Sequence, residues 1–317
     1  MDDDFQSLVN QAQQLLARKY VCDDKELHLR RTKYWDLLDK IKIQRTDAIK
    51  LGHDMLAMPK SYERFFGISL LGQICNPVQK GEEKEAEEIV IRLSNMVDRE
   101  SSVICLSGIA DSLGHTWRRS AEPALLKLSE SQNADIRWAA TVSLGSVCYD
   151  ETSTAVVDRL LILSQDKDPD IRDWATMHLG SVDPDSEEIR EALVARTKDR
   201  HFDTKSEAIN ALAEKNDVRG IAPLLKRLSS KHVGRQDFIS AGIYGLPEFQ
   251  PFLKLEAAEP YSDEPHLIEW AIKRCDPDKK IKDSVDDEWS GEEWYLKVQN
   301  GVRRPIKYKE WDGSDSP

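Results

Sequence analysis

The sequence lacks the residue patterns of the common metal, nucleotide and hydrolase sites. No two cysteines form a CxxC pair, and no HExxH motif occurs among the seven scattered histidines, which excludes the usual zinc sequences. Residues 67–72 imitate the beginning of a P-loop, but Gln73 and Ile74 stand where that loop needs Lys and then Ser or Thr. A nucleophile elbow and a Gly-rich dinucleotide turn are absent as well. We therefore expect no metal and no cofactor, and the sequence favours a non-enzymatic protein.

Cysteines are few and apolar runs are short. The five cysteines, an odd number for disulfide pairing, are compatible with a reducing cytoplasm. Cys75 and Cys148 each follow a repeated glycine by three residues, so we expect both to be small core residues. The chain opens on Met1, three aspartates and Phe5, which is unlike a secretion signal. Because the longest apolar runs are too short to span a bilayer, we expect a cytoplasmic protein without membrane contact.

Positive charge is in deficit, since 45 basic residues stand against 57 acidic ones and the net charge is −12. Such a chain repels phosphate backbones, so we expect poor binding to nucleic acid. An acidic chain suits a basic protein partner, although a modest acidic excess also serves solubility alone. Charge by itself leaves both interpretations open.

The chain repeats itself. Residues 135–145 and 170–180 share the pattern Asp-Ile-Arg followed by a helical run that ends on Leu-Gly, 35 residues apart. In each copy the apolar residues recur at helical spacing and define one buried face, and weaker copies surround Gly72, Gly114 and Ala213. A period of this length indicates stacked helix pairs. We expect the glycine that ends each second helix to let a neighbouring helix approach closely.

The repeat places helix pairs along most of the chain. In the clearest turn, Pro169 ends the first helix and Asp170 is positioned to cap the second. We expect an irregular N-terminal helical cap over 1–44, repeats over 45–275 and a separate extension over 276–317. The pairs are expected near residues 45–75, 85–114, 120–148, 153–182, 186–215, 219–246 and 248–275.

The helical period stops after residue 276. Two alternating segments, 294–298 and 302–308, flank Asn300-Gly301, which predicts a short β-hairpin with a type I′ turn. A lone hairpin is marginal in water, so its aromatic residues must cover the repeats or bind a partner, and the sequence leaves both open. A charged linker, 276–288, precedes it, and the tail 312–317 is expected to be disordered.

This pattern resembles HEAT-like repeats, in particular the short bacterial type that also occurs in phycobilin lyase subunits. The resemblance covers about 45–275 and implies an all-α, right-handed α-solenoid. In that family an Asp in the turn and an Arg six residues later form a ladder along the stack. Asp166 with Arg172 matches that spacing, and Asp199 with Lys205 matches it with Lys in place of Arg. Ser131 and Met58 replace the Asp in two other turns.

Large side chains stand at the beginning of two successive second helices, which line the concave face of such a solenoid. They are Arg137, Trp138, Arg172, Asp173 and Trp174. Trp and Arg are enriched at binding hot spots, so we predict that these residues form the partner-binding surface. The alternative is structural: Trp174 would wedge between repeats, and Trp138 would cover its neighbouring arginine.

These observations favour a non-enzymatic adaptor or inhibitor that binds a protein on its concave face. A basic target, such as a nuclease toxin held by an immunity-type inhibitor, would complement the acidic chain. Resemblance to phycobilin lyases implies chromophore attachment as an alternative, and a HEAT-like DNA glycosylase is a further one that would need a basic groove. The character of the concave face distinguishes these three functions: an acidic face favours a basic protein, a basic face favours nucleic acid, and an apolar aromatic pocket favours a chromophore.

Overall fold

The structure is a computed structural model whose described part is almost entirely helical. It describes residues 3–17, 24–75, 81–147, 152–183, 185–230, 233–258, 265–277, 294–299 and 302–307. The chain is an α-solenoid of HEAT-like helix pairs followed by one short pair of strands, as the sequence predicts. It divides into two compact units: the first unit is Met1–Arg159 and the second unit is Leu160–Pro317.

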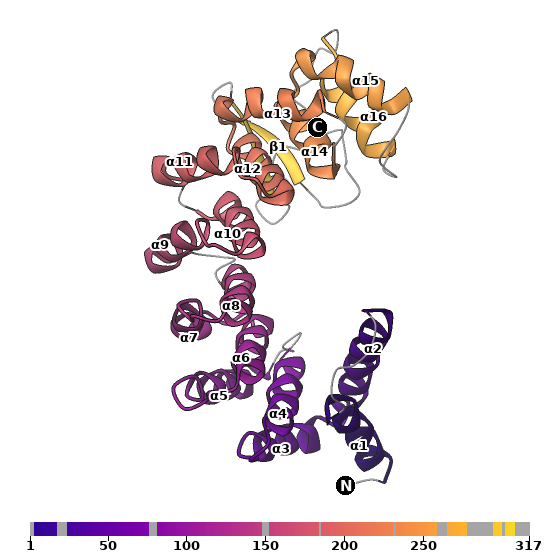
Figure 1. The fold of residues 1–317 in the computed structure, drawn as a ribbon, viewed down its shortest axis with the longest axis vertical. Coiled ribbons are helices and arrows are strands. Elements are labelled where there is room, and N and C mark those ends of the chain that lie inside the picture. Colours follow the sequence, from indigo (N-terminus) through magenta and orange to yellow (C-terminus); the bar gives the residue numbers. More distant parts are fainter. Residues whose placement is uncertain are drawn as a thin grey trace. The chain divides into compact units, whose positions relative to one another are not determined.

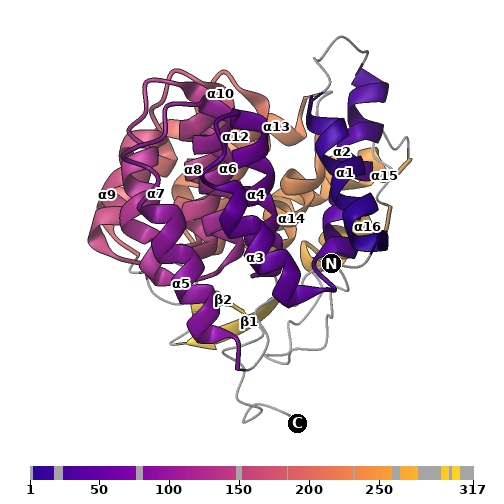
Figure 2. The same cartoon turned by 90° about the horizontal axis from the view of Figure 1, so that it is seen from below.

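The first unit begins with two long helices and continues with regular pairs. Its helices are α1 (Asp3–Ala17), α2 (Asp24–Ile41), α3 (Arg45–Met55), α4 (Ser61–Ile74), α5 (Glu83–Ser94), α6 (Val103–His115), α7 (Glu122–Leu128) and α8 (Ala134–Val147). The second helices α4, α6 and α8 lie side by side, with α5 and α7 on one side of them (Figures 1 and 2). The pair α1–α2 packs on α4, where the ring of Tyr34 stacks on Phe65 at 6.4 Å between centroids.

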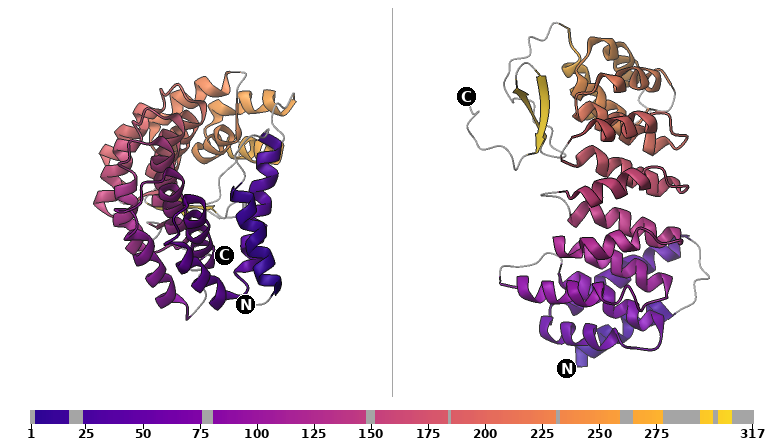
Figure 3. Two further views of the ribbon diagram at one scale, coloured as in Figure 1. Left: turned by 60° about the horizontal axis from the view of Figure 1, so that its bottom comes forward. Right: turned by 90° about the vertical axis from the view of Figure 1, so that its left-hand side faces the viewer.

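The second unit repeats this arrangement. Helix α9 (Thr154–Leu163) runs across the unit boundary, and the helices that follow are α10 (Pro169–Ser181), α11 (Glu187–Arg196), α12 (Phe202–Glu214), α13 (Ile221–Leu228), α14 (Arg235–Tyr244), α15 (Gln250–Ala258) and α16 (Pro265–Arg274). The second helices α10, α12, α14 and α16 again pack one on the next (Figure 3). Short 3-10 turns precede α7, α13 and α15.

The predicted hairpin is present as two antiparallel strands. Strand β1 (Trp294–Gln299) pairs with β2 (Val302–Lys307), and Gln299 lies opposite Val302 (Figure 3). The predicted turn Asn300-Gly301, the linker from residue 278 and the tail lie outside the described residues.

The apolar faces predicted from the repeat are buried. Ile136, Ala140 and Leu144 in α8, and their counterparts in α10, are at most 3% exposed. The repeat glycines allow the second helices to pack closely, as predicted. A Cβ atom on Gly180 would lie 2.7 Å from the Cβ of Ala211, which is closer than side-chain atoms approach. The spacing of the second helices therefore depends on these glycines.

The N-cap of α10 differs from the prediction by two residues. Helix α10 begins at Pro169, and the Oδ1 of Asp168 accepts a hydrogen bond from the backbone N–H of Asp170 at 3.0 Å. Proline suits the first helical position because it has no N–H to leave unsatisfied. Asp168 is therefore the cap, and Asp170 is the second helical residue.

Three cysteines lie in the core. Cys75, Cys105 and Cys275 are free thiols and fully buried, and burial raises the pKa of Cys75 and of Cys275 to about 12. Such thiols are unreactive packing groups. Cys22 and Cys148 lie outside the described residues.

Candidate functional site

Arg172 lies in the first turn of helix α10, and its side chain binds both its own repeat and the next. Its Nη1 donates to the backbone carbonyls of Asp166 at 2.8 Å and Lys167 at 3.2 Å. Its Nε and Nη2 donate to the two carboxylate oxygens of Asp199, each at 2.9 Å. The sequence places Asp166 and Arg172 near each other in a ladder along the stack. Arg172 contacts Asp166 through the backbone carbonyl and forms an ion pair with Asp199 in the turn of the following repeat.

The same use of backbone carbonyls occurs in the first unit. Arg137 donates from Nη1 to the carbonyls of Ser131 at 2.9 Å and Gln132 at 3.0 Å. Arg64 likewise binds two carbonyls of its turn, and it donates to the carboxylate of Glu100, 36 residues ahead. A backbone carbonyl can accept a hydrogen bond from the arginine whatever side chain its own residue has. This explains why Ser131 and Met58 can stand where the family has aspartate.

The ladder arginine holds the carboxylate of Asp199 in its charged form. The hydrogen bonds from Arg172 lower the pKa of Asp199 to about 2, and the backbone N–H of His201 donates a further bond at 2.9 Å. The Asp199 side chain is 5% exposed, so its charge is almost enclosed by donors. Lys205 is half-buried in α12 one repeat later. An ammonium group lacks the planar fork with which Arg172 binds carbonyls and carboxylate together.

The next residue, Asp173, is in the opposite situation. It is half-buried on α10, and its Oδ1 is shielded from solvent without a hydrogen-bond partner among the described residues. Burial, and then the charge of Asp203, raise the pKa of Asp173 to about 6. His201 acts in the other direction, but more weakly than these two. The Asp173 carboxylate is thus poorly solvated and lies near another anion.

Glu207 extends this acidic environment along α12. Burial raises the pKa of Glu207 to about 7, and the charges of Asp173, Glu214 and Asp203 add to the effect. A hydrogen bond of 3.1 Å from Gln236 in α14 opposes it only in part. We refer to Asp173, Asp203, Glu207 and Glu214 as the carboxylate row, since they follow the second helices α10 and α12 of the second unit.

The structure divides the predicted binding residues between two roles. Arg137 is 8% exposed and the Arg172 side chain 15%, and both guanidinium groups bind turn carbonyls. Trp138 is 39% exposed on α8, whereas Trp174 is half-buried on α10 beside His178, with 5.8 Å between ring centroids. Trp138 belongs to the first unit, and the other predicted residues of α10 belong to the second. Of the predicted residues, Asp173 belongs to the carboxylate row, and Trp174 is its neighbour on α10.

Glu207 is not among the binding residues predicted from the sequence, although the sequence contains a signal for it. Glu207 follows Lys205 by two residues, the same offset at which Trp174 follows Arg172. Alignment of the two repeats therefore places Glu207 in the position of Trp174, one repeat further along the stack.

The described part of the chain shows neither a metal site nor a membrane span. Within it, no group of three or more His, Cys, Asp or Glu residues could hold a metal ion, so the carboxylate row is not arranged as a cation site. No helix among the described residues is long and apolar enough to cross a bilayer.

Comparison with known proteins identifies the repeats. The HEAT repeat family matches residues 157–241, which contain most of the ladder and the carboxylate row. The YibA protein of Escherichia coli is similar in structure, with 20% identity, a TM-score of 0.60 and coverage of 86% of this chain and 97% of that one. An engineered protein has 15% identity and a TM-score of 0.50, covering 85% of this chain and 80% of its own.

The complex of CpcE and CpcF of phycocyanin lyase from Nostoc sp. is more distant. It has 15% identity and a TM-score of 0.45, and the match covers 71% of this chain and 93% of that one. No curated protein sequence matches the chain. The family match shows HEAT repeats over residues 157–241, and the likeness to YibA shows the same kind of fold over most of the chain.

Proposed function

We propose that this HEAT-like repeat protein is a non-enzymatic adaptor or inhibitor that binds a basic segment of a partner protein along the carboxylate row. The fold suits this role, because stacked helix pairs display a wide, rigid surface that loses little conformational freedom on binding. The observation that carries the proposal is the state of Asp173 and Glu207. Both carboxylates are partly desolvated, both have raised pKa values, and the charges that raise them are other carboxylates.

Such an arrangement costs stability in the free protein. A carboxylate with a pKa above its usual range is less stable charged in the folded chain than in the unfolded one. Perturbed carboxylates of this kind concentrate at functional sites. A Lys or Arg side chain of a partner would supply the missing positive charge and would complete the hydrogen bonding of Asp173.

The same charge argues against the alternative ligands. Nucleic acid would bring phosphates toward four carboxylates, which is unfavourable for a DNA glycosylase. A chromophore lyase would need an apolar aromatic pocket, and the row is polar. A basic toxin held by an immunity-type inhibitor is one partner with suitable chemistry, and Trp174 beside the row offers an aromatic contact for its lysine or arginine stems.

The test compares capture of partners by the full chain and by variants of the row. The double variant Asp173→Asn with Glu207→Gln keeps the shapes of both side chains and removes their charges. Proteins whose capture depends on the row should be basic, and the double variant should bind them at least about tenfold more weakly, the equivalent of about 1.4 kcal/mol. Binding should also weaken as salt is raised.

Glu188→Gln is the matched control, because Glu188 is an exposed carboxylate on α11 of the same unit. It should leave capture unchanged. Capture that survives the double variant, or row-dependent partners that are acidic, would refute the proposal.

A further inference from the structure

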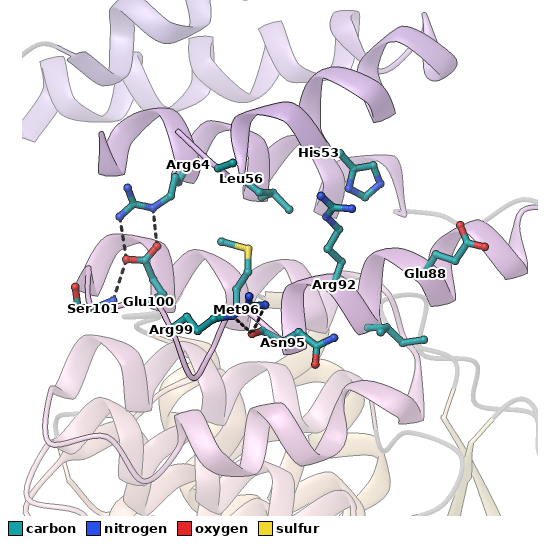
Figure 4. Close-up of a pocket in the computed structure, with 12 residues that line it drawn as sticks. His53, Leu56, Arg64, Glu88, Arg92, Asn95, Met96, Arg99, Glu100 and Ser101 are labelled. Carbon is teal, nitrogen blue, oxygen red and sulfur yellow. Dashed lines mark hydrogen bonds and ion pairs between the residues drawn. The ribbon is translucent and has the colours of Figure 1, made fainter. Parts of the chain in front are cut away.

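A cavity of about 820 Å³ lies in the first unit, where α3 and the beginning of α4 face α5 and the turn after it (Figure 4). This volume is in the range of small-molecule sites. The cavity differs from the carboxylate row in charge, because its unpaired charged group is positive. Its lining residues that matter here are His53, Leu56, Glu88, Ile91, Arg92 and Met96.

Two of the three arginines in the cavity are already engaged. Arg64 is bound to Glu100, with Nε 2.7 Å from Oε2, and the Nε and Nη2 of Arg99 donate to the backbone carbonyl of Asn95. Arg92 makes no hydrogen bond or ion pair with any residue in the described part of the chain. Figure 4 shows its guanidinium extending from α5 toward the ring of His53.

His53 provides the second unmet group. It is half-buried on α3, and its Nδ1 is shielded from solvent without a hydrogen-bond partner among the described residues. Burial, followed by the charge of Arg92, lowers the pKa of His53. A negative group placed between Arg92 and His53 would reverse the second effect and would favour the protonated ring.

Part of the remaining lining is apolar. Leu56 is buried on the α3 side, Ile91 is 53% exposed on α5, and the half-buried Met96 follows α5. Glu88 lies one turn before Arg92 on the same helix and opposes a doubly charged anion. One free guanidinium, one imidazole and an apolar wall match a single negative charge joined to a hydrocarbon group.

We propose that this cavity is a binding site for a small organic carboxylate, which pairs with Arg92 beside His53 and lays its apolar part against Leu56, Ile91 and Met96. Arginine and carboxylate form paired hydrogen bonds, which are stronger than those between neutral groups. The site goes beyond the proposed protein-binding role and shares none of its residues.

The test uses hexanoate as the probe and follows the imidazole signals of His53 by NMR titration of the full chain. Hexanoate should shift these signals saturably and raise the pKa of His53. Hexanamide, which has the same chain without the charge, should bind at least about tenfold more weakly. Inorganic phosphate should also bind more weakly, because Glu88 repels a second charge.

Arg92→Gln should weaken the binding of hexanoate at least about tenfold, and an unchanged circular dichroism spectrum would show that the fold is kept. Lys50→Gln is the matched control, since it makes the same change of charge at an exposed position of α3 that does not line the cavity. It should leave binding unchanged. The proposal is overturned if hexanoate leaves His53 unaffected, if hexanamide or phosphate binds equally well, or if Arg92→Gln and Lys50→Gln behave alike.

Discussion

Asp199 and Asp173 lie in the same unit, yet their pKa values move in opposite directions. Asp199, at the turn edge, is bound by Arg172 and has a pKa of about 2. Asp173, on the second-helix face, is buried near other carboxylates and has a pKa of about 6. Arg172 and Asp173 are adjacent in the chain, so the difference comes from the direction in which each side chain leaves α10. The carboxylate at the turn edge is paired within the protein, whereas the carboxylate on the second-helix face has no positive partner among the described residues.

The contrast indicates a division of work in the repeat. The turn edge contains arginines whose donors are used by carbonyls and by carboxylates of the next turn, which fixes one repeat against another. The second-helix face retains groups that the fold does not neutralise. Natural proteins keep such unfavourable groups where function requires them. Variants at the two places should therefore change stability with opposite signs.

The largest loss is expected from Asp237→Ala at the edge between α13 and α14. Asp237 is fully buried, accepts two hydrogen bonds from Arg227 and accepts a third from the N–H of Gly234. Its removal leaves a buried guanidinium without its partner, which costs about 3–5 kcal/mol. Urea denaturation measures the change. Glu188→Ala, which removes an exposed carboxylate, should alter the free energy of unfolding by less than about 0.5 kcal/mol. Equal effects of the two variants would contradict the role of the pair.

A smaller loss is expected from Asp199→Asn, about 1–3 kcal/mol at pH 7, because Asn retains the shape and loses the charge. The folded pKa of Asp199 lies below its unfolded value of about 3.8. Its contribution is therefore present above pH 4 and is lost as the pH falls toward 2. Denaturation at pH 7 and at pH 3 should show the gap between variant and wild type narrowing. A gap independent of pH would show that charge is not the cause.

Glu207→Gln should have the opposite sign. The folded pKa of Glu207, about 7, lies above the ordinary value of 4.5, so the folded chain holds more protons between these values and loses stability as pH rises through them. Gln lacks this titration. After discount for solvent screening, we expect the variant to be more stable than wild type at pH 8 by on the order of 1 kcal/mol and equal to it near pH 4.5. A destabilised variant at pH 8 would show that the charged carboxylate is satisfied in the fold.

The smallest change in stability is expected from Trp138→Ala. Trp138 is 39% exposed, so its removal should alter the free energy of unfolding by about 0.5 kcal/mol or less. The proposed binding surface is the carboxylate row of the second unit, so partner affinity should change little as well. A loss of about thirtyfold or more, the equivalent of 2 kcal/mol, would instead support the surface on α8 that the sequence predicts. Melting temperature and partner affinity are measured on the same preparation. Unfolding without a change in affinity per folded molecule would place Trp138 in the core instead.

The helices and their pairing could be predicted because they depend on local sequence. The 35-residue repeat, the apolar spacing of Ile171, Ala175 and Leu179, and the glycine that ends α10 each report a constraint within one or two repeats. The N-cap was displaced by two residues, since Asp168 and Asp170 both carry the chemistry of a cap and only the position of Pro169 in the helix separates them. Helix ends depend on such competition between neighbouring residues.

The site could be predicted only in part. Residue type identified Arg137 and Arg172 as candidates for binding, but contacts with turn carbonyls and with Asp199 occupy these arginines. The cavity beside Arg92 had no sequence signal, because α3 and α5 come from different repeats and their distance is a tertiary property.

The solenoid follows from the repeat in the sequence, since a recurring apolar face is buried when each helix pair stacks on the next. Which charged side chains find hydrogen-bond or ion-pair partners depends on how the helices pack in three dimensions. A side chain's pKa depends on burial and on groups many residues away, as Asp173 does on Asp203 and Glu207 on Asp173. The distances between these carboxylates are set when α10 and α12 pack together, so they cannot be derived from any single segment of the sequence.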